Sequence, residues 1–220
     1  MKINILSEQN SVLNKFIEQI RDKEIQQDSM RFRRNLERIG EVTAYELSKT
    51  LDYTPRMVET PLGEASVEMI SDKIVLATIL RAGLPMHQGF LNMFDHAENA
   101  FISAYRRETI GRRGETNLEI VSEYLAAPSI DGKTLILADP MLATGLSMEV
   151  AYKALLSHGT PKHVHIACIF ATPQSIQHLQ ENMPEHATLW CAVIDPELNA
   201  QKYIVPGLGD AGDLCFGTKL

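Results

Sequence analysis

Hydrophobic residues recur every three to four positions near the start of the chain and predict two amphipathic helices. The first pattern runs from Ser11 to about Ile25, and the second from Ser29 to about Lys49. Asp28 or Ser29 is a suitable N-cap for the second helix, because either side chain can accept a hydrogen bond from an N–H group of the first turn. We therefore expect N-terminal helices over residues from about 11 to 50.

The pattern then changes to short, continuous apolar runs bounded by turn residues. Runs of this length are typical of strands that are buried on both faces. They cover residues 74–80, 134–138, 164–170 and 189–194, and helix candidates lie between them at 85–94, 146–157 and 173–181. Alternating strands and helices predict an α/β fold with a central, mostly parallel sheet flanked by helices.

Two further segments predict hairpins. In residues 53–70, Thr60-Pro61-Leu62-Gly63 is a turn signal between β-compatible stretches. Residues from about 105 to 123 are polar and charged, with two Arg-Arg pairs and two glycines. This composition favours an exposed, mobile hairpin arm over a core element. We expect the whole chain, residues 1–220, to form a single domain that includes this arm.

Composition narrows the class of partner. The chain of 220 residues has 21 basic and 28 acidic side chains, a net charge of −7, so nucleic acid is not the expected partner. Neither a signal peptide nor an apolar run long enough for a membrane span is visible. Cys168 and Cys191 lie in apolar runs, where a reduced, buried thiol is expected. We expect a cytoplasmic protein without a membrane partner.

The segment after the second apolar run carries the most specific chemistry. It reads Asp139-Pro140-Met141-Leu142-Ala143-Thr144-Gly145-Leu146-Ser147. An acid ends a predicted strand, small residues let the backbone approach an anion, and hydroxyls precede a helix whose first N–H groups are free. An ordinary strand-to-helix turn capped by Thr144 is the alternative, but the combination of these features favours phosphate binding.

The same segment differs from two familiar phosphate-binding loops. No G-K-[ST] follows it, as a P-loop would require, and the G-x-G-x-x-G of dinucleotide-binding folds is absent. An acidic residue beside a phosphate-binding loop suits a ligand that carries hydroxyl groups a few ångströms from its phosphate. Ribose 5-phosphate has that shape.

This loop resembles the loop for 5-phosphoribosyl diphosphate (PRPP) of the type I phosphoribosyltransferases, and its Asp139-Pro140 pair is similar to the uracil phosphoribosyltransferase family. Two other segments share the resemblance. Leu80-Arg81-Ala82-Gly83-Leu84 is similar to that family's pyrophosphate loop, and residues 203–213 with Phe216-Gly217-Thr218-Lys219 resemble its uracil-binding segment. The match runs from about residue 28 to the C-terminus, and it implies the type I phosphoribosyltransferase fold.

By position, the resemblance implies that two arginines and the loop over residues 139–147 bind PRPP. Arg81 and Arg106 would contact its pyrophosphate, and residues 139–147 would bind its ribose 5-phosphate. Arginine suits pyrophosphate because its planar fork gives paired, charge-assisted hydrogen bonds. Asp139 would orient the ribose hydroxyls. Leu146 stands where the family usually has glycine, and a positive φ at that position would strain leucine.

The base would bind to the C-terminal segment, from about residue 195 to 220. The resemblance implies that Ile204, Gly209 and Ala211 hold uracil through main-chain groups, with Asp210 beside the ribose or a hydrated Mg²⁺. Backbone amides and carbonyls match the alternating edge of uracil, and glycines bring bare backbone close to a flat base. Asp210 is the nearest candidate for a base acting on uracil N1, although a positional role is an equal alternative.

The implied reaction is uracil + PRPP → UMP + pyrophosphate, a step of pyrimidine salvage, with Mg²⁺ carried by PRPP and no direct protein ligand for the metal. The resemblance also implies a homodimer or higher homo-oligomer and leaves GTP open as an effector. Arg31, Arg34 and Arg38 share one helical face, which is a solvated face, a subunit contact or a site for an anionic effector. A PRPP- or nucleotide-sensing regulator and a transferase for another nucleobase remain the alternatives.

Overall fold

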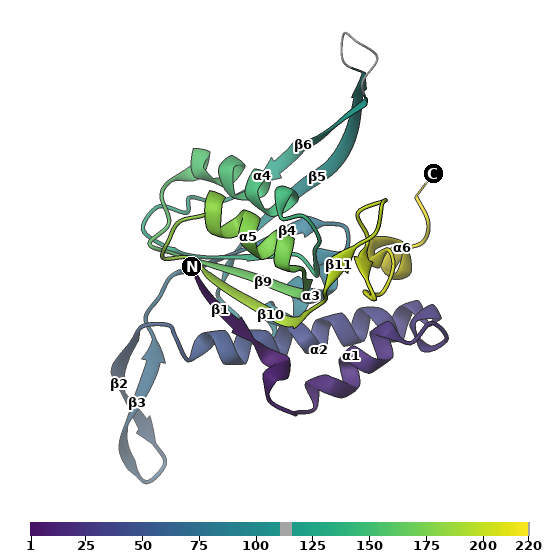
Figure 1. Cartoon of the computed structure of the whole chain (residues 1–220). Helices are drawn as coiled ribbons and strands as arrows, with labels where there is room; N and C mark the ends of the chain where they lie inside the picture. The colour runs from purple at the N-terminus through teal and green to yellow at the C-terminus, as the bar shows by residue number, and fades with distance from the viewer. Residues whose placement is uncertain (111–115, 220) are drawn as a thin grey trace.

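The computed structural model describes residues 1–110 and 116–219, and the backbone alone at 104–110 and 116–123. Its centre is an eight-stranded sheet (Figure 1). Along the sheet the strands are β1 (Lys2–Ile5), β10 (Thr188–Ile194), β9 (His163–Ala171), β7 (Thr134–Ala138), β4 (Ile74–Leu80), β5 (Glu98–Ile110) and β6 (Thr116–Ala126), and the short β8 (Met141–Leu142) also pairs with β9. All neighbours are parallel except β5 and β6, so the predicted α/β class is confirmed.

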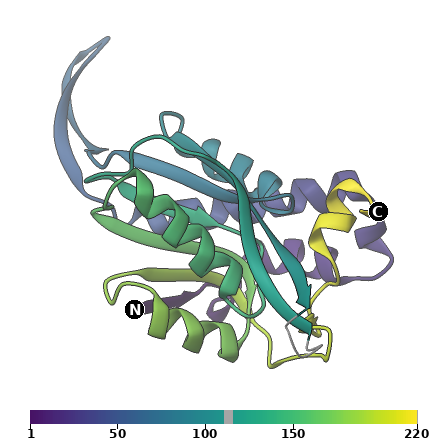
Figure 2. The same ribbon diagram turned by 90° about the horizontal axis from the view of Figure 1, so that it is seen from above.

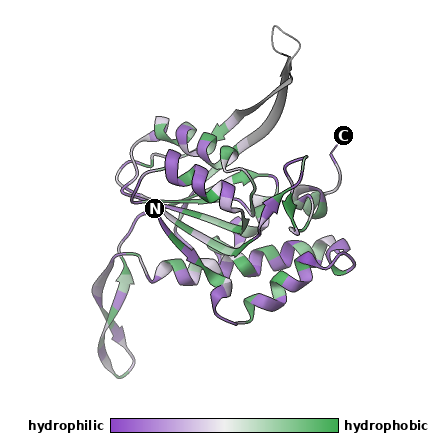
Figure 3. Cartoon of the chain, viewed as in Figure 1, coloured by the Kyte–Doolittle hydropathy of each residue, from purple (hydrophilic) through white to green (hydrophobic). Residues whose placement is uncertain are grey.

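Helices cover both faces of the sheet (Figures 1 and 2). One face packs against α1 (Leu13–Arg21), α2 (Ser29–Ser48) and α3 (Gly83–Leu91), and the other against α4 (Leu146–Leu155) and α5 (Pro173–Asn182). Strand β7 shows why its sequence is continuously apolar: Ile136 belongs to the first core, whereas Leu135 and Leu137 belong to the second. In Figure 3 the central strands are accordingly hydrophobic, while the helices carry mixed surfaces.

Local sequence signals set the helix ends. The Asp28 side chain accepts a hydrogen bond from the Arg31 N–H at 3.1 Å, so Asp28 caps α2 as predicted. Helix α5 begins with a capping box, in which Thr172 and Ser175 satisfy each other's backbone N–H groups, and Pro173 follows the cap. Because Thr172 follows β9 directly, the same residues fix where the chain leaves the sheet.

The two predicted hairpins form at opposite ends of the sheet. β2 (Tyr53–Thr60) and β3 (Gly63–Ile70) pair around the expected turn and extend away from the body before β4 begins (Figure 1). β5 and β6 pair from Phe101↔Ala126 to Ile110↔Thr116, beyond the last β4 partner, Ser103. The tip of this predicted mobile arm, residues 111–115, lies outside the described residues.

Several element predictions need correction. The edge strand β1 and the sheet-forming first half of β5 were not expected, because a single short run has no alternation that distinguishes it from a loop. The first helix ends at Arg21 rather than near residue 25, and a 3₁₀ turn over Ile25–Gln27 follows. Two further 3₁₀ turns lie at Leu6–Glu8 and Leu156–His158. The C-terminal segment contains β11 (Glu197–Leu198), β12 (Ile204–Val205) and the short helix α6 (Ala211–Phe216).

Candidate functional site

Arg81 and Asp139 lie in two loops that leave the same edge of the sheet. β4 and β7 are parallel neighbours with Thr78 opposite Ala138, and the Thr78 hydroxyl donates to the Ala138 carbonyl at 3.2 Å. A Cβ on Gly83 would lie 2.2 Å from the Thr78 hydroxyl and 3.3 Å from the Ala138 carbonyl. The turn after β4 therefore packs directly on the end of β7. Ligands of α/β sheets bind at this carboxyl edge.

The segment after β7 forms a small pocket at the N-terminus of α4. The pocket is lined by Asp139, Met141, Leu142, Ala143, Thr144, Gly145, Ser147 and Met148. The Thr172 hydroxyl donates to the Ala143 carbonyl at 2.8 Å and fixes the loop against the end of β9. The first turn of a helix leaves backbone N–H groups without partners inside the helix and carries its positive dipole end. The arrangement can therefore hold an anion.

Gly145 supplies the only left-handed backbone in this loop, with φ of +84°. A Cβ there would lie 3.0 Å from the His178 ring and 3.2 Å from the Ser175 carbonyl, so both conformation and space require glycine. Leu146, where the family usually has glycine, is the first residue of α4 and has helical backbone. Its exposed side chain causes no positive-φ strain, so the expected difficulty does not arise.

Asp139 is poised to change charge near neutral pH. Burial raises the pKa of its carboxyl to about 7, although the Met141 N–H, 3.3 Å from the Asp139 carboxylate, opposes this effect. A carboxylate accepts hydrogen bonds, whereas the protonated form can also donate one. A ligand that brings hydroxyl donors would favour the charged form, because hydrogen bonds to a carboxylate lower its pKa.

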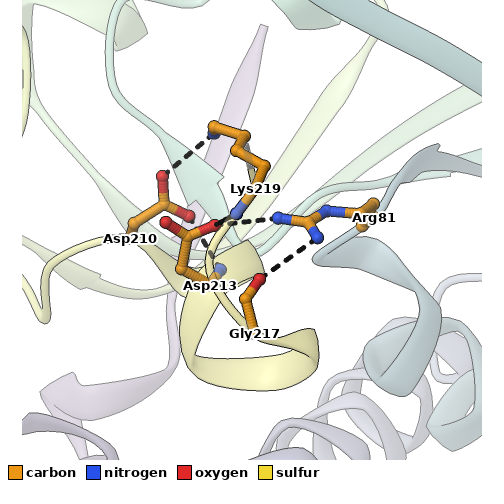
Figure 4. A network of polar contacts seen from close by, with 5 residues as sticks. All are labelled: Arg81, Asp210, Asp213, Gly217 and Lys219. Atoms are coloured by element: carbon orange, nitrogen blue, oxygen red, sulfur yellow. Dashed lines mark hydrogen bonds and ion pairs between the residues drawn. The ribbon is translucent and has the colours of Figure 1, made fainter.

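Arg81 faces the C-terminal segment (Figure 4). Its guanidinium donates to Asp213 at 2.8 Å and to the Gly217 carbonyl at 3.3 Å. Asp213 lies in α6, whose N-cap is Asp210: the Asp210 carboxylate accepts from the Asp213 N–H at 3.0 Å and pairs with Lys219 at 3.3 Å. Arg81 thus connects the turn beside β7 with the segment that resembles a base-binding loop.

Hydrogen bonding keeps Asp210 charged. Burial alone would raise its pKa, but the Asp213 N–H and the charge of Lys219 outweigh burial and hold the pKa below its ordinary value. A carboxylate with a lowered pKa is a weaker proton acceptor than an ordinary one. The environment of Asp210 therefore favours a positional role over one as a general base.

The segment before α6 presents backbone rather than side chains. Gly207 and Gly209 have φ of +51° and +94°, and a Cβ on Gly209 would meet nothing within 4 Å. The side chains of Ile204 and Ala211 are buried, which leaves their main-chain groups as the polar groups available there. The bend beside Gly209 is open on the side where a Cβ would be.

Of the predicted site residues, Arg106 is the one whose side chain lies outside the described part of the chain. Its backbone belongs to β5 and pairs with Ile120. Three residues that contact the predicted site were missed by the sequence reasoning: Arg21, Asp195 and Asp213. Asp213 stood within a quoted motif, but Arg21 precedes residue 28, where the resemblance seen in the sequence begins, and had no local signal.

The described residues contain neither a metal cluster nor a membrane span. Among the residues whose side chains the structure describes, 1–103 and 124–219, no three His, Cys, Asp or Glu side chains gather closely enough to hold a metal ion by themselves. Within the same ranges, no helix combines the length and apolar character that crossing a bilayer requires. All three cysteines are free and buried.

A mostly parallel α/β sheet with a pocket at a helix N-terminus, and with an arginine in the neighbouring loop at the same edge, is typical of the class of proteins that bind phosphorylated ligands. Comparison with known proteins identifies the family. The family model described as Uracil phosphoribosyltransferase matches residues 7–218, and the chain belongs to that family.

Individual relatives are similar over most or all of the chain. The uracil phosphoribosyltransferase of Porphyromonas gingivalis is 55% identical over 220 residues, which is 100% of both proteins. That of Pyrobaculum arsenaticum is 40% identical over 202 residues, 90% of this chain and 92% of the relative. Among solved structures, the AQ2163 protein from Aquifex aeolicus superposes with a TM-score of 0.83 at 28% identity and 99% coverage of both chains.

Proposed function

We propose that this chain transfers the 5-phosphoribosyl group of PRPP to N1 of uracil, forming UMP and releasing diphosphate. Membership of the uracil phosphoribosyltransferase family supports the activity. The observation that carries the proposal is the position of Arg81, which follows the strand beside β7 and contacts Asp213 in the C-terminal segment. An anion-binding arginine between a phosphate pocket and an exposed backbone bend suits a reaction that joins a sugar phosphate to a base.

The 5-phosphate of PRPP would bind at the start of α4. Residues 139–147 would surround it, with N–H groups from the Gly145 turn and hydroxyls from Thr144 and Ser147 as donors. Met141, Leu142 and Ala143 would contribute backbone to the wall of the pocket. Asp139, at the tip of β7, would accept hydrogen bonds from the ribose hydroxyls. Burial raises the pKa of Asp139 in the free protein, and these hydroxyls would oppose that effect because hydrogen bonds to a carboxylate favour its charged form.

The leaving diphosphate would contact Arg81 and Arg106. Arg81 would exchange Asp213 and the Gly217 carbonyl for phosphate oxygens, which charge-assisted pairing favours. Mg²⁺ bound to the diphosphate would neutralise part of the charge that grows on the leaving group. The site fits this ion as a guest of PRPP, because the lowered pKa of Asp210 keeps a carboxylate that could accept hydrogen bonds from water ligands of the ion.

Uracil would bind to the backbone of Ile204, Gly209 and Ala211. Main-chain donors and acceptors are fixed by the fold, and they match the carbonyl and N–H groups of the base edge. Asp210 would hold the bend as the N-cap of α6 and face the ribose. As C1 of the ribose gains oxocarbenium character, Arg81 and Arg106 would stabilise the negative charge that grows on the leaving diphosphate, while Asp139 would orient the ribose hydroxyls.

The domain organisation, cellular location, oligomeric state and regulation of the protein are predictions. We propose that residues 1–220 act as a single domain, in the reducing cytoplasm that its free cysteines suit, and as a homo-oligomer. Regulation by GTP stays a prediction. The β5–β6 arm, which carries Arg106, would help to exclude water from the site.

Product formation tests the proposal. The protein is incubated with Mg²⁺, PRPP and ¹⁴C-uracil, and labelled UMP is separated by chromatography while PRPP binding is measured by calorimetry. We expect UMP to form in proportion to enzyme and time. PRPP binding without UMP formation would instead support a regulator that senses PRPP.

A further inference from the structure

We propose that Arg21 and Asp195 form a clamp that positions the base-binding segment for uracil. The inference rests on the proposed function and adds a specific role for two residues that lie outside the phosphate pocket. Neither would touch a substrate. Both would act through Gly207, which lies between the proposed uracil contacts Ile204 and Gly209.

The clamp binds both backbone polar groups of Gly207, its N–H and its carbonyl. Arg21 makes a paired contact with the Asp195 carboxylate, at 3.0 and 2.7 Å, and also donates to the Gly207 carbonyl at 3.0 Å. The Asp195 carboxylate in turn accepts from the Gly207 N–H at 3.0 Å. Three residues far apart in sequence therefore close a ring of hydrogen bonds, and rotation of the Gly207 backbone would break at least one of them.

The backbone at Gly207 needs this support. Its φ of +51° lies in the left-handed region, and a Cβ there would be 2.2 Å from the Ile204 carbonyl. The chain turns back on Ile204 within three residues, so small changes at Gly207 move the bend that contains Gly209. Glycine has little conformational preference of its own, and the external hydrogen bonds must select one conformation.

The clamp itself is held rigidly. The Asp195 side chain is only 5% exposed and that of Arg21 23%. The Asp195 N–H donates to the Ala171 carbonyl at 2.9 Å, which ties the acid to the end of β9. The Arg21 guanidinium also lies over the Phe170 ring, 4.3 Å from its centroid. The contact with an aromatic ring and the bidentate pair restrict arginine in a way that lysine cannot reproduce.

A second contact from the same region reinforces the arrangement. With its amide oriented to face two carbonyls, Gln26 donates to Leu208 at 3.0 Å and to Ile20 at 2.9 Å. The end of α1 and the turn after it therefore hold consecutive residues of the base-binding segment. Arg21, the last residue of α1, and Gln26 in the 3₁₀ turn would thereby help to position the proposed base-binding segment.

A positioning role and a purely structural role predict different kinetics. Loss of fold stability lowers the active fraction and hence the apparent kcat, but leaves both KM values unchanged. Loss of clamp geometry weakens uracil binding while PRPP, held at the other loops, binds as before. The ratio of the two KM values therefore separates the roles.

The test compares Arg21→Lys and Asp195→Asn with the wild-type protein, both chosen because they preserve size and, for lysine, charge. We expect KM for uracil to rise about tenfold in each, as loss of a buried charge-assisted hydrogen bond implies, with KM for PRPP changed less than about twofold. Arg56→Lys is the matched control, since it makes the same substitution at an exposed arginine of the β2–β3 hairpin, which extends away from the body of the molecule (Figure 1). It should leave both KM values within about twofold.

Two outcomes would overturn the clamp. Equal changes in both KM values, or a fall in kcat alone that follows the folded fraction measured by circular dichroism, would assign Arg21 and Asp195 to fold stability. Failure of the wild-type protein to form UMP would instead contradict the proposed function. In that case, calorimetric affinity for UMP, compared between the wild-type protein and Arg21→Lys, would still test the clamp: equal affinities would refute it.

Discussion

The guanidinium of Arg81 donates to the carboxylate of Asp213 at 2.8 Å, which joins the loop after β4 to helix α6. Both side chains are partly exposed, at 40% and 25%, so the pair is accessible to an incoming ligand. An arginine that is already paired must exchange its partner to bind pyrophosphate. The pair would therefore link occupation of the proposed pyrophosphate site to the position of the segment that would hold the base.

Substitutions at this pair should show whether Asp213 competes with PRPP for Arg81 or holds Arg81 in place. Arg81→Lys should raise KM for PRPP about tenfold, because lysine keeps the charge but loses the paired geometry. Asp213→Asn removes the competing charge while preserving shape, and KM for PRPP should stay equal or fall. Steady-state kinetics at fixed Mg²⁺ measure both. A clear increase in this KM for Asp213→Asn would mean that the acid positions Arg81 rather than competing for it.

Gly145→Ala should damage the phosphate pocket. A left-handed alanine costs about 1–2 kcal/mol, and crowding against His178 adds to this cost. Denaturant unfolding should show the loss of stability, and KM for PRPP should increase. Gly132→Ala is the control, since Gly132 has φ of +66° but open space around it. If both variants lost stability equally and kept the same KM, the tight fit around Gly145 would be irrelevant to binding.

The rate should depend on pH through Asp139. Burial raises the pKa of this carboxyl to about 7 in the free protein, and the carboxylate is the form that accepts hydrogen bonds from ribose hydroxyls. We expect kcat/KM for PRPP to rise as pH increases through about 7. Asp139→Asn should lower kcat/KM strongly and abolish its rise with pH, apart from the part that comes from titration of PRPP itself, which affects both proteins. If kcat/KM of the variant rose with pH in the same way as that of the wild-type protein, the rise would belong to another group.

The same residue should make the protein less stable as pH rises from about 4 to about 7. A carboxyl whose folded pKa is raised above 3.8 favours folding at low pH, and this contribution is lost as pH rises from about 4 to about 7. Asp139→Asn cannot ionise, so the Tm difference between the variant and the wild-type protein should grow in favour of the variant over this interval and then level off. Calorimetry at pH 4, 6 and 8 measures it. A constant difference would show that Asp139 is not destabilised by burial.

Secondary structure could be predicted closely where a single short segment contains both the expected binding residues and the signals for the end of a strand and the start of a helix. The loop from Asp139 to Ser147 was predicted as a strand end, turn and helix start, and the structure places β7 and α4 at those positions. Buried parallel strands were equally visible, because a short continuous apolar run between turn residues is typical of a strand covered on both faces. The hairpin over residues 53–70 followed from its turn residues.

Long-range relationships could not be predicted in the same way. Arg21 and Asp195 are 174 positions apart, and each alone resembles an ordinary charged surface residue. The contact of Arg81 with Asp213 depends on how α6 folds back onto the loop after β4, which local patterns do not determine. The roles assigned to the individual site residues remain predictions.

Base selectivity is the most direct test of the central claim. The wild-type protein, Mg²⁺ and PRPP are combined with uracil, cytosine, hypoxanthine or orotate at equal concentrations, and the rate of monophosphate formation is measured for each base. We predict rapid formation of UMP from uracil and rates at least about a hundredfold lower with the other bases, because a site that hydrogen-bonds one base edge leaves buried groups unpaired with another. A rate with any other base that exceeds the rate with uracil would contradict the proposed function. So would PRPP binding without any formation of UMP from uracil.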